Sequence, residues 1–259
     1  MITAGNLQHI SGARSRSRTI QQIADAFNKY AGQYGVTSQK DVAQFLANVS
    51  IETGGFRHLA ENMNYSAKRL RQVWPSRFKT VAKAKQYENN PQKLANYVYG
   101  DRLGNKGREN AGWLYRGSGP GQVTGYSNFL SVQKETGLPV VSNPDLLREA
   151  DSGMRAALIL WQKWGLSAMD GQTTNIRKRW NGGSHGLNEV KAAYARAMQI
   201  DLSMPVRTPA KPVETRPARQ VPTKGKVTVV ALLAAAGATI AAKWSGFSAW
   251  LCDVLPFCQ

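Results

Sequence analysis

The chain has 259 residues, with 34 Lys and Arg against 16 Asp and Glu, and a formal net charge of +18 at pH 7. Its hydrophobic content of 42% is sufficient for one domain of about 200 residues with a buried core, plus an appendage. The two cysteines are Cys252 and Cys258, so a disulfide framework and a cysteine nucleophile are excluded from the main part of the chain. The charge predicts attraction to a polyanion, namely nucleic acid, anionic lipid or the phosphate-rich bacterial envelope, without choosing among them.

The N-terminal residues 1–17 are predicted to form a basic arm. They lack an apolar run, which predicts that no cleavable secretory signal is present. Arg14, Arg16 and Arg18 alternate with serines, a pattern that favours a solvated arm over a nucleic-acid-binding element. The main domain is therefore placed at residues 18–202.

The first part of this domain is predicted to be helical. Apolar residues recur at helical spacing over 20–31, and Gly35 is placed to end that helix. A second helix is predicted to begin near Ser38, to bury an apolar face, and to stop at Gly54-Gly55.

The second part of the domain continues the helical pattern. Asn90-Pro91 is a cap and first-turn signal for a helix that Gly100 closes. No alternating segment is long enough for a central strand, so the fold class is predicted to be mainly α. Further elements are expected over 126–136, 144–165 (with a break near Asp151) and 187–200, with a small β-hairpin around 112–124.

Residues 203–226 are predicted to form a semi-extended linker, because five prolines alternate with basic and small residues. The segment 227–259 then begins with an uncharged run from Val227 to Ala242. A helix of that length rises about 24 Å, slightly less than the roughly 30 Å of a hydrocarbon core. Lys243 and the aromatic residues after it suit a membrane interface. A transmembrane or membrane-active helix within 227–251 is predicted, and an Ala-rich packing helix is the alternative.

If that helix spans a membrane, the basic residues of the linker outnumber Lys243, which places the main domain on the cytoplasmic side. Cys252 and Cys258 would then face an oxidising space, where they could pair.

Two glutamates nine residues apart carry the chemical signal. Glu52 ends an apolar helix before Thr53-Gly54-Gly55, where unpaired carbonyls, the helix dipole and partial burial disfavour its ionised form, as a general acid requires. Glu61 lies in a polar stretch suited to keeping a carboxylate charged, as a base for water. A pair of carboxylates is the minimum equipment for hydrolysing a glycosidic bond.

Two glycine-rich turns accompany the glutamates. Residues 115–129 place four glycines and a proline before a predicted helix, and this loop lacks the Gly-Lys-Ser/Thr ending of a phosphate loop. Trp180-Asn181-Gly182-Gly183 is a further glycine-rich turn that presents a polar side chain.

These blocks, in this order over about residues 15–200, make the chain resemble the family 19 glycoside hydrolases, which are chitinase-like inverting enzymes, and especially their bacteriophage endolysin branch. The resemblance implies a lysozyme-like, two-lobed helical fold. By position it implies that Glu52 is the general acid, that Glu61 is the general base and that Thr124 helps to hold the attacking water. It further implies sugar-binding or carboxylate-orienting roles for four residues: Tyr115, Gln122, Asn128 and Asn181.

The chain departs from the family pattern at three positions. The family commonly has Arg where Ser118 stands and His where Ile51 stands. An Arg expected in the helix after Asn-Gly-Gly falls at or near Val190, with Lys191 adjacent. An inverting mechanism predicts carboxyl groups roughly 6.5–9.5 Å apart.

Other kinds of site receive little support from the sequence. The three histidines are scattered, so no metal site is expected, and no cofactor is implied. Nucleic acid is not the expected partner. Trp161 and Trp164 are predicted to be core residues, whereas sugar stacking and core packing are equally compatible with three others: Trp74, Trp113 and Trp180.

The leading hypothesis is a peptidoglycan-cleaving endolysin of the lysozyme type, made in the host bacterial cytoplasm or held at the inner membrane and acting on periplasmic peptidoglycan. The alternatives are a chitinase, a virion-borne wall hydrolase used at entry, or a catalytically inactive, membrane-tethered wall-binding protein. Which glycosidic bond is cut and whether a holin is needed are left open by the sequence.

Overall fold

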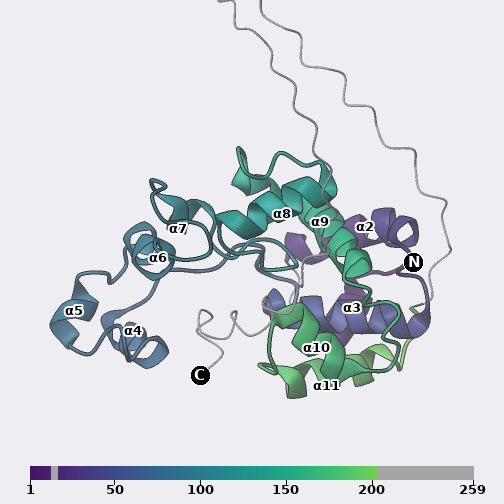
Figure 1. Cartoon of the computed structure of the whole chain (residues 1–259). Coiled ribbons are helices and arrows are strands. Elements are labelled where there is room, and N and C mark those ends of the chain that lie inside the picture. The colour runs from purple at the N-terminus through teal and green to yellow at the C-terminus, as the bar shows by residue number, and fades with distance from the viewer. Residues whose placement is uncertain (13–16, 203–259) are drawn as a thin grey trace, which may run out of the picture.

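The computed structural model describes residues 1–12 and 17–202, so the predicted linker and apolar segment, 203–259, lie outside the described residues. The described part is built of helices joined by turns (Figure 1). The α-helices and 3-10 helices are α1 (Ala4–Ser11), α2 (Arg18–Tyr30), η1 (Ala31–Tyr34), α3 (Gln39–Glu52), α4 (Ala67–Val73), α5 (Val81–Lys85), α6 (Pro91–Tyr99), α7 (Ala111–Leu114), α8 (Tyr126–Thr136), η2 (Pro144–Arg148), α9 (Ala150–Lys163), α10 (Thr173–Asn181) and α11 (Leu187–Ala197).

The mainly helical class is confirmed, and local capping signals explain several of the helix boundaries. Ser38 caps α3 by accepting the Asp41 N–H at 3.2 Å, and Asn90 caps α6 by accepting that of Lys93 at 3.1 Å. Gly35 follows η1 with φ of 75°, in the left-handed region that glycine adopts without strain. The predicted break within 144–165 falls at Glu149, where backbone φ/ψ are extended between η2 and α9.

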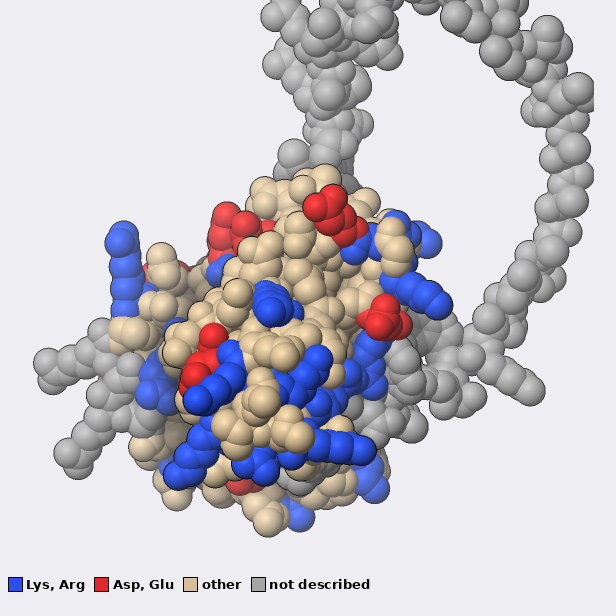
Figure 2. All heavy atoms as spheres, turned by 90° about the vertical axis from the view of Figure 1, so that its left-hand side faces the viewer, with Lys and Arg blue, Asp and Glu red and all other residues tan. Residues whose placement is uncertain are grey.

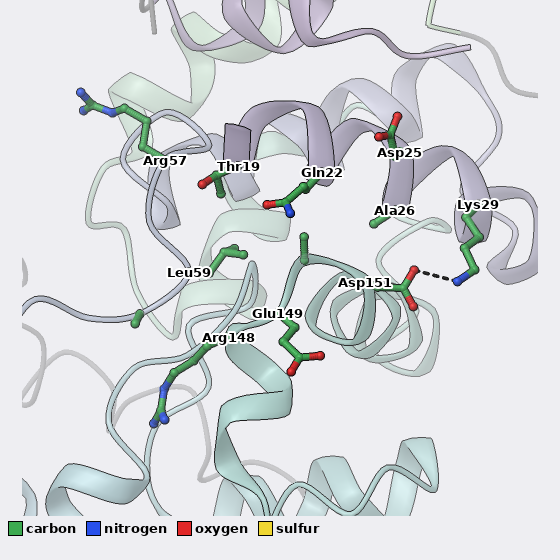
Figure 3. A pocket seen from close by; sticks show the side chains of 12 residues that line it. Thr19, Gln22, Asp25, Ala26, Lys29, Arg57, Leu59, Arg148, Glu149 and Asp151 are labelled. Carbon is green, nitrogen blue, oxygen red and sulfur yellow. Dashed lines mark hydrogen bonds and ion pairs between the residues drawn. The ribbon is translucent and has the colours of Figure 1, made fainter. Parts of the chain in front are cut away.

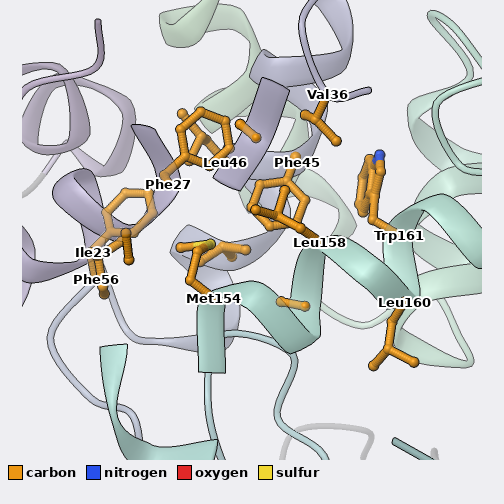
Figure 4. Close-up of a cluster of buried hydrophobic side chains, with 14 of the residues drawn as sticks. Ile23, Phe27, Val36, Phe45, Leu46, Phe56, Met154, Leu158, Leu160 and Trp161 are labelled. Atoms are coloured by element: carbon orange, nitrogen blue, oxygen red, sulfur yellow. The ribbon is translucent and has the colours of Figure 1, made fainter. Parts of the chain in front are cut away.

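A large hydrophobic core surrounds α3 (Figure 4). Phe45 lies at its centre, fully buried, with its ring 5.6 Å from that of Phe27 and 5.2 Å from that of Trp161. Trp161 is 0% exposed and its indole N–H donates to Asp41 Oδ1 at 2.9 Å, which satisfies the one polar atom that burial of this side chain would otherwise leave unpaired. The core position predicted for Trp161 is confirmed.

A second, separate core holds α4, α5 and α6 together. It is rich in aromatic residues, with Trp74 5.3 Å from Tyr65 and Phe78 5.6 Å from Tyr87, between ring centroids. Tyr99, at the end of α6, is fully buried in it. The two cores give the molecule two lobes, and Figure 1 shows the small one, with α4 to α7, projecting from the large one.

The N-terminal arm predicted for residues 1–17 is instead partly structured. Residues 4–11 form α1, whose Leu7 and Ile10 are fully buried against the large core. Thr3 and Asn6 form a reciprocal capping box at its start. The large lobe therefore begins at the first residues of the chain, because Ile2 is also buried there.

The hairpin expected around 112–124 is much reduced. Residues 111–114 are helical, and the described residues contain isolated bridges in place of longer strands: Ala60 with Ser118, and Ser118 with Val123. Among the described residues, no helix has the length and hydropathy needed to cross a bilayer.

Candidate active site

Glu52 is the last residue of α3, and its carboxylate points toward α10. Its Oε1 accepts a hydrogen bond from Arg177 Nη1 at 2.6 Å and another from Asn181 Nδ2 at 3.1 Å. The Arg177 side chain is 1% exposed and that of Glu52 is 10% exposed. The sequence interpretation considered only the helix dipole and partial burial at Glu52, and the structure adds a buried cation beside it.

The Arg177 contact was missed by the sequence analysis. Arg177 lies four residues before Asn181 in α10, so both side chains share one helix face. On the facing side of α3, Asn48 lies four residues before Glu52, and its Oδ1 is 3.3 Å from Arg177 Nη1. The His185 carbonyl accepts from Arg177 Nε at 2.8 Å. The four-residue spacing of the polar residues on both helices was the signal that could have identified this contact.

Position 190 does not supply the arginine that the family pattern suggested. Val190 is fully buried in the large core, and Lys191 is exposed. The guanidinium beside Glu52 therefore comes from the helix before the Asn-Gly-Gly turn, at Arg177. Ile51, which stands where the family has His, packs partly buried against the large core.

A sharp turn carries the chain from Glu52 to Glu61. The Thr53 hydroxyl donates to the Val49 carbonyl at 2.6 Å and accepts the Phe56 N–H at 2.9 Å. Gly54 and Gly55 adopt φ of 58° and 81°, which a glycine tolerates and a branched residue would not. The Thr53-Gly54-Gly55 sequence thus sets the geometry of the turn.

Glu61 is bound by partners from the small lobe and the glycine-rich loop. Tyr99 donates its hydroxyl to Oε1 at 2.6 Å, and the Gly117 N–H donates to Oε2 at 3.1 Å. Burial raises the pKa of Glu61, while these two donors and the nearby charge of Arg116 act in the opposite direction. The prediction that a polar stretch keeps Glu61 charged is corrected in this respect, since desolvation is the largest influence on its pKa.

The glycine-rich loop comes next to Glu61 through backbone pairing. The Glu61 N–H donates to the Gly117 carbonyl at 2.8 Å, and the Gly119 N–H donates to the Leu59 carbonyl at 2.7 Å. A Cβ at Gly117 would lie 3.1 Å from Glu61 Cβ. Only a glycine allows this approach without displacing the carboxylate.

Three of the residues predicted for this loop bind one another. The Thr124 hydroxyl donates to the Gln122 carbonyl at 3.0 Å, and Asn128 Nδ2 donates to the Thr124 carbonyl at 2.7 Å. Gln122 has a φ of 46°, which is uncommon for a side-chain-bearing residue and is typical of positions where function imposes strain. Because the Thr124 hydroxyl donates its proton to the backbone, its lone pairs remain available to accept one.

The remaining loop residues have structural partners. Tyr115 is 7% exposed, packs against Phe129 with ring centroids 5.0 Å apart, and donates its hydroxyl to the Val141 carbonyl at 3.0 Å. This places Tyr115 in the large core. Ser118 is fully buried and accepts from Arg148 Nε at 3.0 Å, so a guanidinium reaches this position from η2 even though the family arginine is absent.

Two of the three tryptophans considered for sugar stacking are buried, and the third is partly exposed. Trp74 is 7% exposed and Trp180 is 6% exposed, and each packs within a core. Trp113 is partly exposed, and the Arg116 guanidinium lies 3.6 Å from its ring centroid. Trp113 is therefore the least buried of the three, with Arg116 over its ring.

A pocket of about 750 Å³ adjoins the turn that leads to Glu61 but is not the site itself. Leu59 and Ala60 form part of its wall, together with Arg57, Arg148 and residues of α2 (Figure 3). Neither Glu52 nor Glu61 lines it. Within residues 1–12 and 17–202, no group of three His, Cys, Asp or Glu side chains is placed to hold a metal ion.

The two glutamates thus lie at the junction of the lobes, with Glu52 fixed to the large lobe through Arg177 and Glu61 fixed to the small lobe through Tyr99. The predicted separation of their carboxyl groups stays a prediction. The arrangement offers two carboxylates with different environments, a threonine hydroxyl and an amide, which is a set suited to hydrolysis by acid and base.

Comparison with known proteins identifies the family of the chain. No family model matches the chain. A protein of Haemophilus influenzae, described as a glycosyl hydrolase family 19 domain-containing protein, is 31% identical over 183 residues, which are 70% of this chain and 90% of that protein. The crystal structure of chitinase C from Streptomyces griseus HUT6037 is similar with a TM-score of 0.50 at 16% identity, covering 79% of each chain, and so shares the fold. The chain therefore belongs to glycosyl hydrolase family 19 and is a glycoside hydrolase.

Proposed function

We propose that the protein is a peptidoglycan-degrading endolysin that hydrolyses β-1,4 linkages between amino sugars with inversion at the anomeric carbon. The observation that carries this proposal is the pair Glu52 and Glu61, held from opposite lobes. A glycan strand lying between the lobes would have one carboxyl group on each side of the bond to be cut, as an inverting mechanism requires.

In this mechanism Glu52 is the general acid. Both of its donors bind the same oxygen, Oε1, so Oε2 is left to carry the proton to the leaving oxygen. Arg177 also binds Asn48 and the His185 carbonyl, and it keeps those acceptors when Glu52 becomes neutral.

Glu61 is the general base. A raised pKa makes a carboxylate a stronger base, and the donors Tyr99 and Gly117 favour its ionised form. A water molecule that donates one proton to Glu61 and the other to the Thr124 hydroxyl would direct its lone pair at the sugar. The Thr124 hydroxyl is suited to this because its own proton is used by the Gln122 carbonyl.

The experiment for the overall activity is the clearing of purified peptidoglycan by the wild type and by Glu52→Gln. Loss of an acid catalyst is expected to lower the rate about a hundred- to ten-thousandfold. Equal clearing by the two proteins would show that Glu52 is not the acid. Mass spectrometry of the fragments identifies the bond, and NMR of the first-formed anomer reports inversion.

A second experiment separates the two roles. On an aryl glycoside whose leaving group needs no protonation, Glu52→Gln should retain most of the wild-type rate, while Glu61→Gln should remain inactive. The reverse result would assign the acid to Glu61.

A chitinase is the second candidate, because the solved structure with the shared fold is a chitinase. Peptidoglycan and chitin should be offered to the same preparation. The net charge of +18 favours peptidoglycan in an anionic wall as the substrate, because a cationic protein is attracted to a polyanion. Added salt weakens that attraction, so hydrolysis of the wall should slow with salt, whereas hydrolysis of uncharged chitin should be much less salt-dependent.

The site of action is part of the proposal. We infer that the protein acts on the wall from the host side, at or near the inner membrane, with the segment 227–251 providing the membrane contact. Truncation after Ser203 should then leave the hydrolysis of isolated wall intact and reduce the share of protein that sediments with membranes. Identical fractionation would contradict the membrane role of that segment.

A further inference from the structure

The small lobe has a strongly basic outer face. Between residues 62 and 110 the chain has eleven Lys and Arg against three Asp and Glu, and between residues 66 and 87 it has seven against none. Figure 2 looks onto the side of the molecule where α4 and α5 lie in Figure 1, and it shows Lys and Arg gathered there. Five exposed residues of this region form what we call the basic face: Lys68, Arg69, Arg71, Lys79 and Lys85.

The charge of the basic face is not neutralised within the described part of the protein. The ion pairs found among the described residues use cations elsewhere, such as Lys29, Lys163 and Arg177. Within the part of the chain that the structure describes, Arg69 has only the neutral Gln72 as a side-chain hydrogen-bond partner, at 3.3 Å. Like charges so concentrated repel one another, and an external anionic surface would relieve that repulsion.

A hollow between α4 and α5 interrupts the face. It encloses about 480 Å³ and is lined by Ala67, Lys68, Arg71, Gln72 and Val81. Lys68 and Arg71 are three residues apart on α4 and therefore lie on the same side of the helix. Val81 is 49% exposed, so an aliphatic surface adjoins two cations. This combination fits a phosphate headgroup with apolar groups beside it.

Three aromatic residues next to α4 and α5 argue against single-stranded nucleic acid as the occupant. Binding of single strands relies on aromatic side chains on which bases stack. Trp74, Phe78 and Tyr87 are 7%, 1% and 9% exposed, and they pack against neighbouring rings. The basic face therefore offers cations and an aliphatic residue, without a stacking platform.

We propose that the basic face binds the surface of a membrane that contains anionic phospholipids. The apolar run 227–242 predicted from the sequence would be a second, separate membrane contact, and two weak contacts together hold a protein at a bilayer far better than one. This inference goes beyond the glycosidase function and does not depend on which glycan is cut.

The test uses the full chain and two variants that each lose two positive charges. The face variant is Lys68→Gln with Arg71→Gln. The matched control is Lys134→Gln with Arg18→Gln, which are exposed residues of α8 and α2. Binding is measured by sedimentation with vesicles of phosphatidylcholine containing phosphatidylglycerol, and with vesicles of phosphatidylcholine alone. Circular dichroism and wall hydrolysis confirm that both variants are folded.

The wild type should bind the anionic vesicles more tightly than the neutral ones, and added salt should reduce the difference. Each basic residue near an anionic membrane contributes about 1 kcal/mol, so the face variant should bind about thirtyfold more weakly. The control should bind nearly as the wild type does. Equal binding by the two variants, or equal binding of the wild type to both kinds of vesicle, would overturn the proposal. A face variant that loses binding only to duplex DNA would assign the surface to nucleic acid and would overturn it as well.

Discussion

Replacement of Tyr99 by Phe is the most direct test of how the protein sets the charge of Glu61. The substitution removes only the hydroxyl that donates to Glu61 Oε1 at 2.6 Å. Burial and the Glu61 charge raise the pKa of Tyr99 well above its ordinary value, so this hydroxyl keeps its proton and donates throughout the working range. In the Tyr99→Phe variant, the Glu61 carboxylate would retain the Gly117 N–H as a donor.

The magnitude follows from the type of bond. A hydrogen bond to a charged group contributes about 1.5–3 kcal/mol, and one pKa unit corresponds to about 1.4 kcal/mol. Loss of the Tyr99 hydroxyl should therefore raise the pKa of Glu61 further. Since a general base works only when ionised, the rate falls as the pH drops through this pKa. The acidic limb of the pH–rate profile should move to higher pH, and on that limb Tyr99→Phe should be about ten- to a hundredfold slower than the wild type at the same pH.

The assay is hydrolysis of a soluble glycan fragment over a range of pH by the wild type, Tyr99→Phe and Tyr97→Phe. Tyr97 lies on the same helix and packs among the aromatic side chains of the small lobe, so its variant controls for loss of a hydroxyl from that lobe. At high pH, where Glu61 is ionised in every protein, the rates of Tyr99→Phe and the wild type should converge. An acidic limb that stays in place, or moves to lower pH, would refute the role assigned to Tyr99.

Three further outcomes are expected. Arg177→Met should destabilise the fold by about 3–5 kcal/mol in urea denaturation, because a buried Glu52 loses its partner, and adding Glu52→Gln should recover part of the loss. Gly117→Ala should lower kcat about a hundredfold with little change in the urea midpoint, because the new Cβ displaces Glu61 and the flexible end of Gln122; an unchanged kcat would contradict the close approach. Glu61→Gln should raise the thermal midpoint relative to the wild type at neutral pH, because the variant has no charge to bury at this position. This advantage should disappear as the pH falls from the raised pKa of folded Glu61 through the pKa of Glu61 in the unfolded chain, since the wild-type carboxyl group is then neutral as well.

Local signals in the sequence determined most of the helices around the site. Ser38 and Asn90 cap their helices through side chains that accept from backbone N–H groups three residues later, and such contacts depend only on near neighbours. The helix over 126–136 has the predicted bounds. By contrast, α1 was missed because only Ile2, Leu7 and Ile10 mark it as buried, a pattern too short to show helical periodicity.

The sequence by itself determined the family and singled out Glu52 and Glu61, because the glutamates and the glycine-rich turns lie in short, ordered blocks. The tertiary structure decided what surrounds each carboxylate. Arg177 is 125 residues away from Glu52, and Tyr99 is 38 residues away from Glu61. Charge state depends on burial and on such distant donors, and no local pattern records them. For this reason the sequence identified the two groups, and only the packing of the two lobes showed that one is held by a guanidinium and the other by a phenol.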